Sequence, residues 1–504
     1  MTSPTSSDAL ARNKLGVSSI VFLVLAAVAP LTVAIVVLPL AIAFGNGGGT
    51  PVAVLIVAVA LLLFAIGYAQ ITKDLVNAGG FYAIAVKGLG RAAGLVTGLI
   101  ATIGYNFFVA GALGTIGFFT GAVVLPALFG FEVHWFLCGF VLFAIIFLLA
   151  RSGIHVSAIV LGVALVLEIV ILLAFGISVL IQTGFSLDAF TMALSPEILV
   201  GGSIWIGLLM VATAFIGFEA TALFGEEAKN PRKTIPRATY ASIIIIGLMH
   251  AFVAWAIVSA VGVADAQAAA LDSLAAGDLT LVLIDTYLGP FVGVIALVLL
   301  VVSLFAAQLA FHNSAGRYLF ALGRARVLPQ WLARTNSKGA PERALIVNFV
   351  FAVFVAGIFA VFVETDADGI PLPPVLTLVP VGLGFATLAI MIVQAIAALS
   401  IVVYFRRTRN PRWWSTFIAP GIGFIALFVF SVMAIFNFTL VAGSEALYVQ
   451  LLPWLLVLAV VGGVIYASYL KSRKPEVYRG LEADLENFTE LPEDHTMSGL
   501  PGNH

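Results

Sequence analysis

Two glutamates lie inside long apolar stretches of the chain. Glu219 follows Gly217-Phe218 in the run that begins at Gly201, and Glu168 has apolar residues on both sides in the run 156–181. An ionisable side chain at the depth that such a run implies is costly unless it faces protein or water, so each glutamate is a candidate functional group. A carboxyl shielded from water favours its protonated form, and a change of access lets it load or release a proton. We therefore predict that Glu168 and Glu219 couple the protein to protons.

Three roles are open for Glu168: a proton carrier, a structural acid paired with Gln308 or His312, and a sodium ligand. Gln308 and His312 lie four residues apart and therefore on one face of a helix. Because this span is expected to run inward from about Pro290, Gln308 falls in the inner half of the membrane, where it can hydrogen-bond Glu168 or Glu219. We add Gln308 to the coupling candidates and interpret His312 as structural.

Composition identifies a membrane protein. Hydrophobic residues make up 62% of the 504 residues and charged residues 10%, with a mean hydropathy of +1.14; soluble domains carry roughly 25% charged residues. A net charge of -1 gives no electrostatic support for a nucleic-acid partner. The single cysteine, Cys138, excludes an intrachain disulfide and a cysteine-based metal site. We expect lipid surroundings, no metal and no cofactor.

Twelve apolar runs are long enough to cross roughly 30 Å of hydrocarbon. They lie at about residues 17–44, 51–71, 92–128, 135–150, 156–181, 201–224, 240–263, 290–322, 344–363, 374–405, 413–441 and 451–470. If both termini are cytoplasmic, all 24 Lys and Arg residues fall in inner loops or tails, as the positive-inside rule requires. We therefore predict a multi-pass protein of the cytoplasmic membrane, with cytoplasmic tails at 1–15 and 472–504.

Two of these spans carry helix-breaking residues near their middle. The first contains a proline, which lacks an amide donor, and the sixth contains a glycine, which permits unwinding. Kinked spans are common in membrane proteins, but breaks five spans apart are typical of two five-helix repeats of opposite orientation with a site between them. We predict repeats at 16–182 and 183–405, with further spans at 406–471. The predicted cargo-binding residues of the two breaks are Ala29, Pro30, Leu31, Thr32, Ala214, Phe215, Ile216, Gly217 and Phe218.

Two further features could serve the same site. Tyr105 lies roughly 20 Å from the inner end of the third span by helical rise and is a candidate cargo contact, with ordinary packing as the alternative. Glu226 and Glu227 precede Arg232 in a basic loop. These three residues can form an ion-pair network at an inner gate; the alternative is a solvated loop that only sets the topology.

Three motifs resemble the signature of the amino acid, polyamine and organocation (APC) transporters. They are 217–219 with 226–238, 77–82 with 88–91, and 312–324 with 328–329, so the resemblance covers spans one to ten. It implies the five-plus-five inverted-repeat fold of the leucine transporter, an all-α polytopic membrane protein that moves a small nitrogenous solute by alternating access. Phe215 and Phe218 resemble the aromatic lids of this family. At the position of Glu168, some proton-coupled relatives carry a lysine in place of a sodium ion.

The resemblance leaves the cargo open between two classes. Amino acid carriers of this family often have a glycine-rich first break whose N–H groups hold the carboxylate, whereas residues 29–32 contain a proline and resemble the break of bacterial putrescine importers. We expect this break to offer carbonyls more readily than donors. We predict a proton-coupled amino acid importer, with an amine or polyamine carrier as the alternative. A membrane enzyme is less favoured, because the sequence has neither metal-ligand spacing nor a phosphate-binding glycine motif. A receptor, which is also less favoured, could reuse the same fold and would bind its ligand saturably without flux.

Overall fold

The computed structural model describes residues 15–75, 80–152, 158–184, 188–199, 201–219, 221, 228–366, 368–410, 412–442 and 444–486. Up to residue 221, the described part contains α1 (Val17–Val28), α2 (Pro30–Thr32), η1 (Val33–Val37), α3 (Leu38–Phe44), η2 (Gly47–Gly49), α4 (Thr50–Asp74), α5 (Gly80–Leu89), α6 (Arg91–Phe118), η3 (Phe119–Val124), α7 (Leu125–Phe129), α8 (Trp135–Arg151), α9 (Ala158–Gln182), α10 (Asp188–Ala193), α11 (Pro196–Leu199) and α12 (Ile204–Thr213).

From residue 228 onward, the helices are α14 (Pro231–Val261), α15 (Ala266–Asp272), α16 (Leu279–Leu288), α17 (Pro290–Arg324), η4 (Gln330–Ala333), α18 (Glu342–Val361), α19 (Leu378–Arg407), η5 (Trp414–Ile418), α20 (Ala419–Phe436), α21 (Phe438–Ala442), α22 (Leu447–Arg473) and α23 (Pro475–Glu486). The all-helical prediction is confirmed. The predicted repeat boundary at 182 coincides with the end of α9, and the boundary at 405 falls two residues before the end of α19. The assignment of the repeats themselves stays a prediction.

Ten helices of the described residues are long and apolar enough to cross a membrane. Two of the twelve predicted spans fall outside this set. The span expected at 135–150 is α8, a helix of 17 residues, and the span expected at 201–224 is helical as α12 only as far as Thr213. A multi-pass membrane protein is therefore confirmed, whereas the count of twelve spans stays a prediction.

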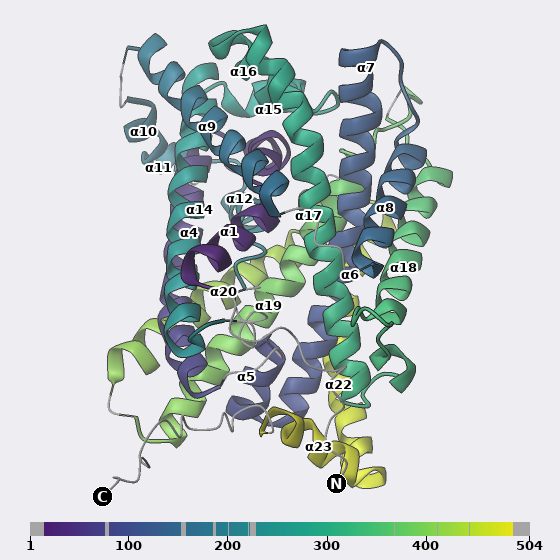
Figure 1. The fold of residues 1–504 in the computed structure, drawn as a ribbon. Helices are drawn as coiled ribbons and strands as arrows, with labels where there is room; N and C mark the ends of the chain where they lie inside the picture. Colours follow the sequence, from purple (N-terminus) through teal and green to yellow (C-terminus); the bar gives the residue numbers. More distant parts are fainter. Residues whose placement is uncertain are drawn as a thin grey trace, which may run out of the picture.

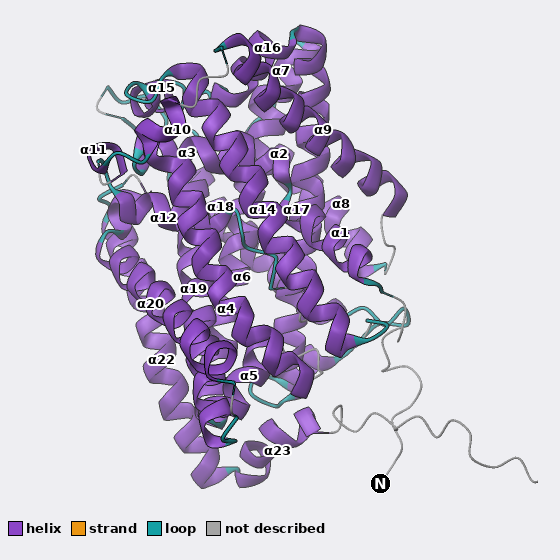
Figure 2. Cartoon of the chain, turned by 90° about the vertical axis from the view of Figure 1, so that its left-hand side faces the viewer, coloured by secondary structure: helices purple, strands orange, loops and turns teal. Residues whose placement is uncertain are grey.

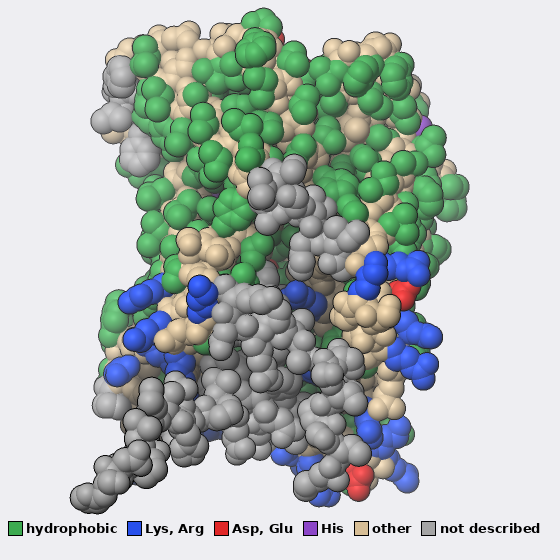
Figure 3. Space-filling view, viewed as in Figure 1, with side chains coloured by type: hydrophobic (Ala, Val, Ile, Leu, Met, Phe, Trp, Pro, Cys, Tyr) green, Lys and Arg blue, Asp and Glu red, His purple; other side chains and the backbone are tan. Residues whose placement is uncertain are grey.

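The long helices run side by side along one axis of the molecule (Figures 1 and 2). The short helices α15 and α16 lie at one end of this bundle, and α5 and α23 lie at the opposite end. Figure 3 shows that Lys and Arg side chains gather toward the end that holds α5 and α23, while hydrophobic side chains cover the rest of this face. This separation is the pattern that the positive-inside rule predicts; which end faces the cytoplasm stays a prediction.

Three π-helical turns each lie just ahead of a proline. The segments η1, η3 and η5 each end two residues ahead of a proline, at Pro39, Pro126 and Pro420. A proline inside a helix donates no hydrogen bond and its ring crowds the carbonyl four residues earlier, so a locally widened turn lets the helix continue. The prolines therefore modify these helices without ending them.

Close helix packing depends on glycine where the central helices meet. A Cβ built on Gly382 of α19 would lie 2.8 Å from the Cα of Gly111 of α6, which is closer than atoms can pack. Small residues let helix backbones approach closely within a membrane. The contact fixes α6 against α19 and thereby sets the position of Tyr105 on α6.

Candidate functional site

The first predicted break is present, and it creates an amide donor. Helix α1 ends at Val28, Ala29 adopts φ 54° and ψ 75°, and α2 begins at Pro30. Because Pro30 has no N–H, Leu31 offers the first amide after the break. That amide donates to Oε2 of Glu168 over 3.2 Å. The break therefore presents at least one amide donor, which faces a carboxylate. The expectation that it offers carbonyls more readily than donors stays a prediction.

Glu168 lies at the centre of a buried hydrogen-bond network. Its side chain is 3% exposed. Besides the amide of Leu31, Oε2 accepts a hydrogen bond of 2.9 Å from the hydroxyl of Ser303 on α17. Thr32 donates to the same Ser303 hydroxyl over 3.1 Å. These four residues, which we call the Glu168 network, join the broken first span to α9 and α17.

The second break is formed by the turn that follows α12. The helix ends at Thr213, residues 214–219 form turns, and Gly217 adopts φ 117°, a conformation that other residues rarely tolerate. Oε2 of Glu219 accepts a hydrogen bond of 2.9 Å from the amide of Gly217, and Oε1 accepts one of 2.6 Å from the hydroxyl of Tyr105. The structure thus brings together two residues, Tyr105 and Glu219, that the sequence assigned to different roles.

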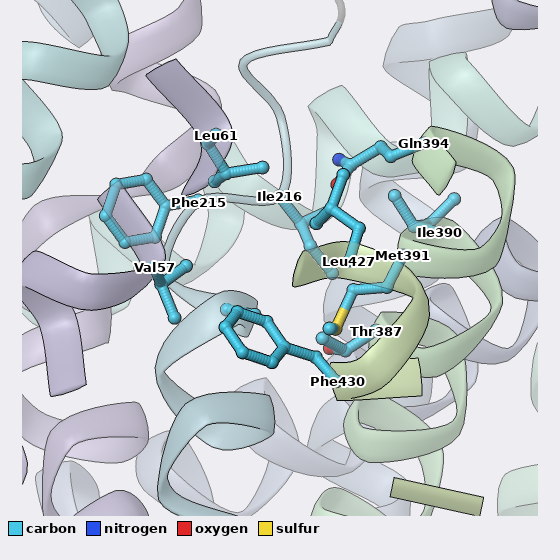
Figure 4. A pocket seen from close by; sticks show the side chains of 11 residues that line it. Val57, Leu61, Phe215, Ile216, Thr387, Ile390, Met391, Gln394, Leu427 and Phe430 are labelled. Carbon is cyan, nitrogen blue, oxygen red and sulfur yellow. The ribbon is translucent and has the colours of Figure 1, made fainter. Parts of the chain in front are cut away.

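A pocket lies beside this second break (Figure 4). Phe215 and Ile216 line it from the turn, Thr387 and Gln394 line it from α19, and the remaining lining residues are apolar. A hydroxyl hydrogen bond of 2.7 Å joins Thr387 to Thr213 at the end of α12. The free space inside is enough for about one water molecule. The pocket therefore has no room for an amino acid in this conformation.

Gln308, which we expected to hydrogen-bond Glu168 or Glu219, has a different partner. The amide of Gln308 donates to the carbonyl of Val109 over 3.1 Å. His312 instead shares a hydrogen bond of 2.5 Å with the Oδ1 of Asn348. The alternative in which Glu168 pairs with Gln308 or His312 therefore has no contact to support it, because helical spacing fixes a face of α17 but does not fix which neighbour that face meets. The role of Gln308 in coupling stays a prediction without a contact to support it.

The histidine belongs to a second buried network. The side-chain amide of Asn348 donates 2.8 Å to Oδ1 of Asn106, and the amide of Asn106 donates 2.7 Å to the carbonyl of Thr102. The chain of contacts from His312 thus reaches the residue next to Tyr105. The structural role predicted for His312 agrees with this arrangement.

The site also contains residues that sequence reasoning missed. Ser303, Thr387, Gln394, Asn106 and Asn348 were not predicted as part of it. Each is a buried polar side chain within an apolar span, which is a weak signal, because serine, threonine and asparagine often bond only their own helix.

The predicted inner gate is only partly described. Glu226 and Glu227 lie outside the described residues, and Arg232 is exposed in the first turn of α14. The loop before α14 does contact the residues just ahead of the first span, because the amide of Lys229 donates a hydrogen bond of 2.9 Å to the carbonyl of Leu15, two residues before α1 begins. The ion-pair network of the gate stays a prediction.

The described helices form a membrane bundle with two interrupted spans. One buried acid, Glu219, lies in the second break, and the other, Glu168 on α9, accepts a hydrogen bond from the first break. The structure resembles a crystal structure of a mutant of the manganese transporter from Eremococcus coleocola, with a TM-score of 0.56 at 12% sequence identity. The match covers 96% of this chain and 99% of that chain. At this identity the likeness shows the fold alone, and it confirms the leucine-transporter type of fold.

Residues 15–465 match the amino acid permease family, and the chain belongs to this family. It is 28% identical over 304 residues to the branched-chain amino acid permease of Lactococcus lactis, covering 59% of this chain and 60% of that protein. It is 26% identical over 306 residues to the arginine/ornithine antiporter of Pseudomonas aeruginosa, covering 58% and 59% of the two chains. The matches thus span about 60% of the length of these relatives.

Proposed function

We propose that this protein is a secondary active transporter that imports an amino acid across the cytoplasmic membrane by alternating access and is driven by protons. Membership of the amino acid permease family supports transport of a small solute. The relatives named above are a permease for branched-chain amino acids and an antiporter for arginine and ornithine, which supports an amino acid cargo. In this proposal both termini lie in the cytoplasm.

The observation that carries the proton coupling is the position of Glu168. It is a buried acid that accepts hydrogen bonds from both the broken first span and α17. A change of its charge alters the strength of both bonds, because a carboxylate accepts roughly twice as strongly as a neutral group. Protonation at Glu168 therefore biases the contact between two elements that alternating access must move relative to one another.

Glu219 is the second coupling candidate, and its hydrogen-bond donors lie on other elements than those of Glu168. Its hydrogen bonds come from Gly217 in the same turn and from Tyr105 on α6. We propose that Glu219 fixes the shape of the second break and places Tyr105 and Phe215 next to the cargo. The residues of both breaks then surround the solute from opposite sides of the bundle.

An amine carrier is the second candidate function. The observation in its favour is that the amide of Leu31 already holds a carboxylate, namely that of Glu168. A solute without a carboxylate would not need this donor. Two buried acids near the breaks would also attract a cation.

Uptake by purified protein in liposomes tests the proposed function. Radiolabelled L-leucine, L-arginine, putrescine and agmatine are offered with an inward proton gradient, with an inward sodium gradient, and with neither. Accumulation of an amino acid that collapses when a protonophore is added supports the proposal. Accumulation of amines alone supports the second candidate, sodium dependence assigns Glu168 to sodium, and saturable binding without flux indicates a receptor.

A further inference from the structure

The first amide after the break in the first span is occupied by a carboxylate of the protein itself. Leu31 donates to Glu168 over 3.2 Å, and both groups are buried. From this contact we infer that the carboxylate of an amino acid cargo replaces Glu168 on the Leu31 amide, and that it does so only after Glu168 has taken up a proton. This inference rests on the proposed function, because it requires a cargo that carries a carboxylate.

The break offers the two kinds of group that an α-amino acid needs. The C-terminal end of α1 carries partial negative charge and suits an ammonium, whereas the start of α2 carries partial positive charge and suits a carboxylate. Ala29 separates the two ends by a single residue. An α-amino acid bears its ammonium and its carboxylate on one carbon, so one cargo molecule can meet both ends.

An ionised Glu168 blocks this arrangement. Two carboxylates that compete for one donor cannot both remain ionised at close range, so the binding of the second favours protonation of the first. Once neutral, Glu168 accepts the Leu31 amide more weakly than an ionised cargo carboxylate does. The hydroxyl of Ser303, 2.9 Å from Oε2, can then accept the hydrogen bond of the new proton, because a hydroxyl both donates and accepts.

Other titratable groups lie on the helices that pack against α9. These helices are α1, α2, α14, α16 and α17, of which α1 and α2 carry no titratable side chain. The other three carry Arg232, Lys233, Arg237, Tyr240, His250, Asp285, Tyr287, His312, Arg317, Tyr318 and Arg324. Among the described residues, the hydrogen bonds to Glu168 come from Leu31 and Ser303 alone.

The spacing along the helices separates several of these groups from Glu168. His312 lies nine residues beyond Ser303 on α17, which is about 13 Å along the helix. The carbonyl of Tyr287 contacts Ser178, which lies ten residues beyond Glu168 on α9, or about 15 Å. The Leu31 amide bonds directly to a titratable group, and that group is Glu168.

Equilibrium binding as a function of pH tests the inference. Binding of radiolabelled L-leucine and L-arginine to the purified full chain is measured from about pH 5 to about pH 8, where the α-carboxyl and the α-ammonium of both stay charged. Their decarboxylated partners, isoamylamine and agmatine, are measured alongside. The variants are Glu168→Gln and, as a matched control, Glu132→Gln, which alters an exposed loop glutamate.

For the wild type and Glu132→Gln, we expect the affinity for the amino acid to fall about tenfold per pH unit wherever Glu168 is ionised, because one proton is linked to each bound ligand. Glu168→Gln is expected to bind the amino acid with the same affinity across the range. By the same linkage, the wild-type protein should take up as much as one proton from a weakly buffered solution for each L-leucine that it binds. This measurement tests the inference without any variant.

Three results overturn the inference while the proposed function stands. They are an amino acid affinity that does not change with pH in wild type, a pH slope that persists in Glu168→Gln, and ligand binding without proton uptake. A different result would be that the amines bind more tightly than their matched amino acids and that their affinity rises with pH. Glu168 would then be the counter-ion of a cationic cargo. If neither amino acid binds nor is transported, the proposed function itself fails, and the inference falls with it.

Discussion

The hydroxyl of Tyr105 lies 2.6 Å from Oε1 of Glu219, although the two residues are 114 positions apart in the chain. This hydrogen bond ties α6 to the turn that follows α12. The tyrosine ring is itself held by Tyr318 of α17, with ring centroids 5.1 Å apart. The second break is thereby attached to two helices that pack on each other in the centre of the bundle.

Replacing Tyr105 by phenylalanine should weaken cargo binding. The change removes one of the two hydrogen bonds to Glu219, and a bond to a charged group contributes about 1.5–3 kcal/mol, or roughly ten- to a hundredfold in the dissociation constant. Equilibrium binding of the best ligand measures the loss. Tyr318→Phe is the matched control, because it removes a hydroxyl from the stacked neighbour and keeps the ring. Equal losses in the two variants would mean that packing, and not the bond to Glu219, supports the site.

Replacing Glu168 by glutamine should uncouple transport. The neutral amide cannot change its charge, so we expect gradient-driven accumulation in liposomes to disappear while exchange of labelled for unlabelled cargo partly persists. Uptake under a proton gradient and counterflow without one measure the two activities in the same preparation. Accumulation that keeps its wild-type dependence on the proton gradient would remove Glu168 from the coupling mechanism.

A β-branched residue at Gly217 should disturb the second break through its backbone. A Cβ there would have ordinary contacts, 3.6 Å from Val28 and 3.7 Å from Phe311, so space is not the obstacle. The φ of 117° is the obstacle, and holding another residue in such a conformation costs about 1–3 kcal/mol. We expect Gly217→Val to lower the melting temperature and weaken cargo binding. Gly421→Val, at a helical glycine with open space around it, should bind cargo normally.

Loss of Asn348 should destabilise the bundle. Asn348 joins His312 to Asn106, so alanine leaves two buried polar groups without this partner, each at a cost of about 1–3 kcal/mol. Thermal unfolding in detergent measures the change. Asn437→Ala breaks a single side-chain bond to a carbonyl of the helix that ends just before it, and it should have a smaller effect. Similar melting temperatures for the two variants would show that the buried network contributes little stability.

The orientation of the chain can be tested with introduced cysteines. Glu132 and Lys338 are exposed in loops at opposite predicted sides of the membrane, and the native Cys138 is buried. A membrane-impermeant maleimide should label Glu132→Cys in intact cells and should label Lys338→Cys only after permeabilisation. Labelling in the reverse order would invert the predicted topology.

The sequence by itself determined the class of fold and the location of both breaks. Long apolar runs require helices, because a backbone in hydrocarbon must satisfy its own hydrogen bonds, and the placement of Lys and Arg favours one orientation. Pro30 and Gly217 act on their own backbone, so their effects could be predicted from local chemistry. Glu168 and Glu219 stood out for a similar reason, since an acid within an apolar run is costly wherever it lies.

Only the tertiary structure decided which groups meet. Helical periodicity placed Gln308 and His312 on one face, but it could not show that this face meets Val109 and Asn348 instead of Glu168. The pairing of Glu168 with Leu31 and Ser303 depends on how α9, α2 and α17 are rotated and shifted against one another. Those offsets are set by many close contacts between helices far apart in the chain, and a single sequence carries no local signal for them.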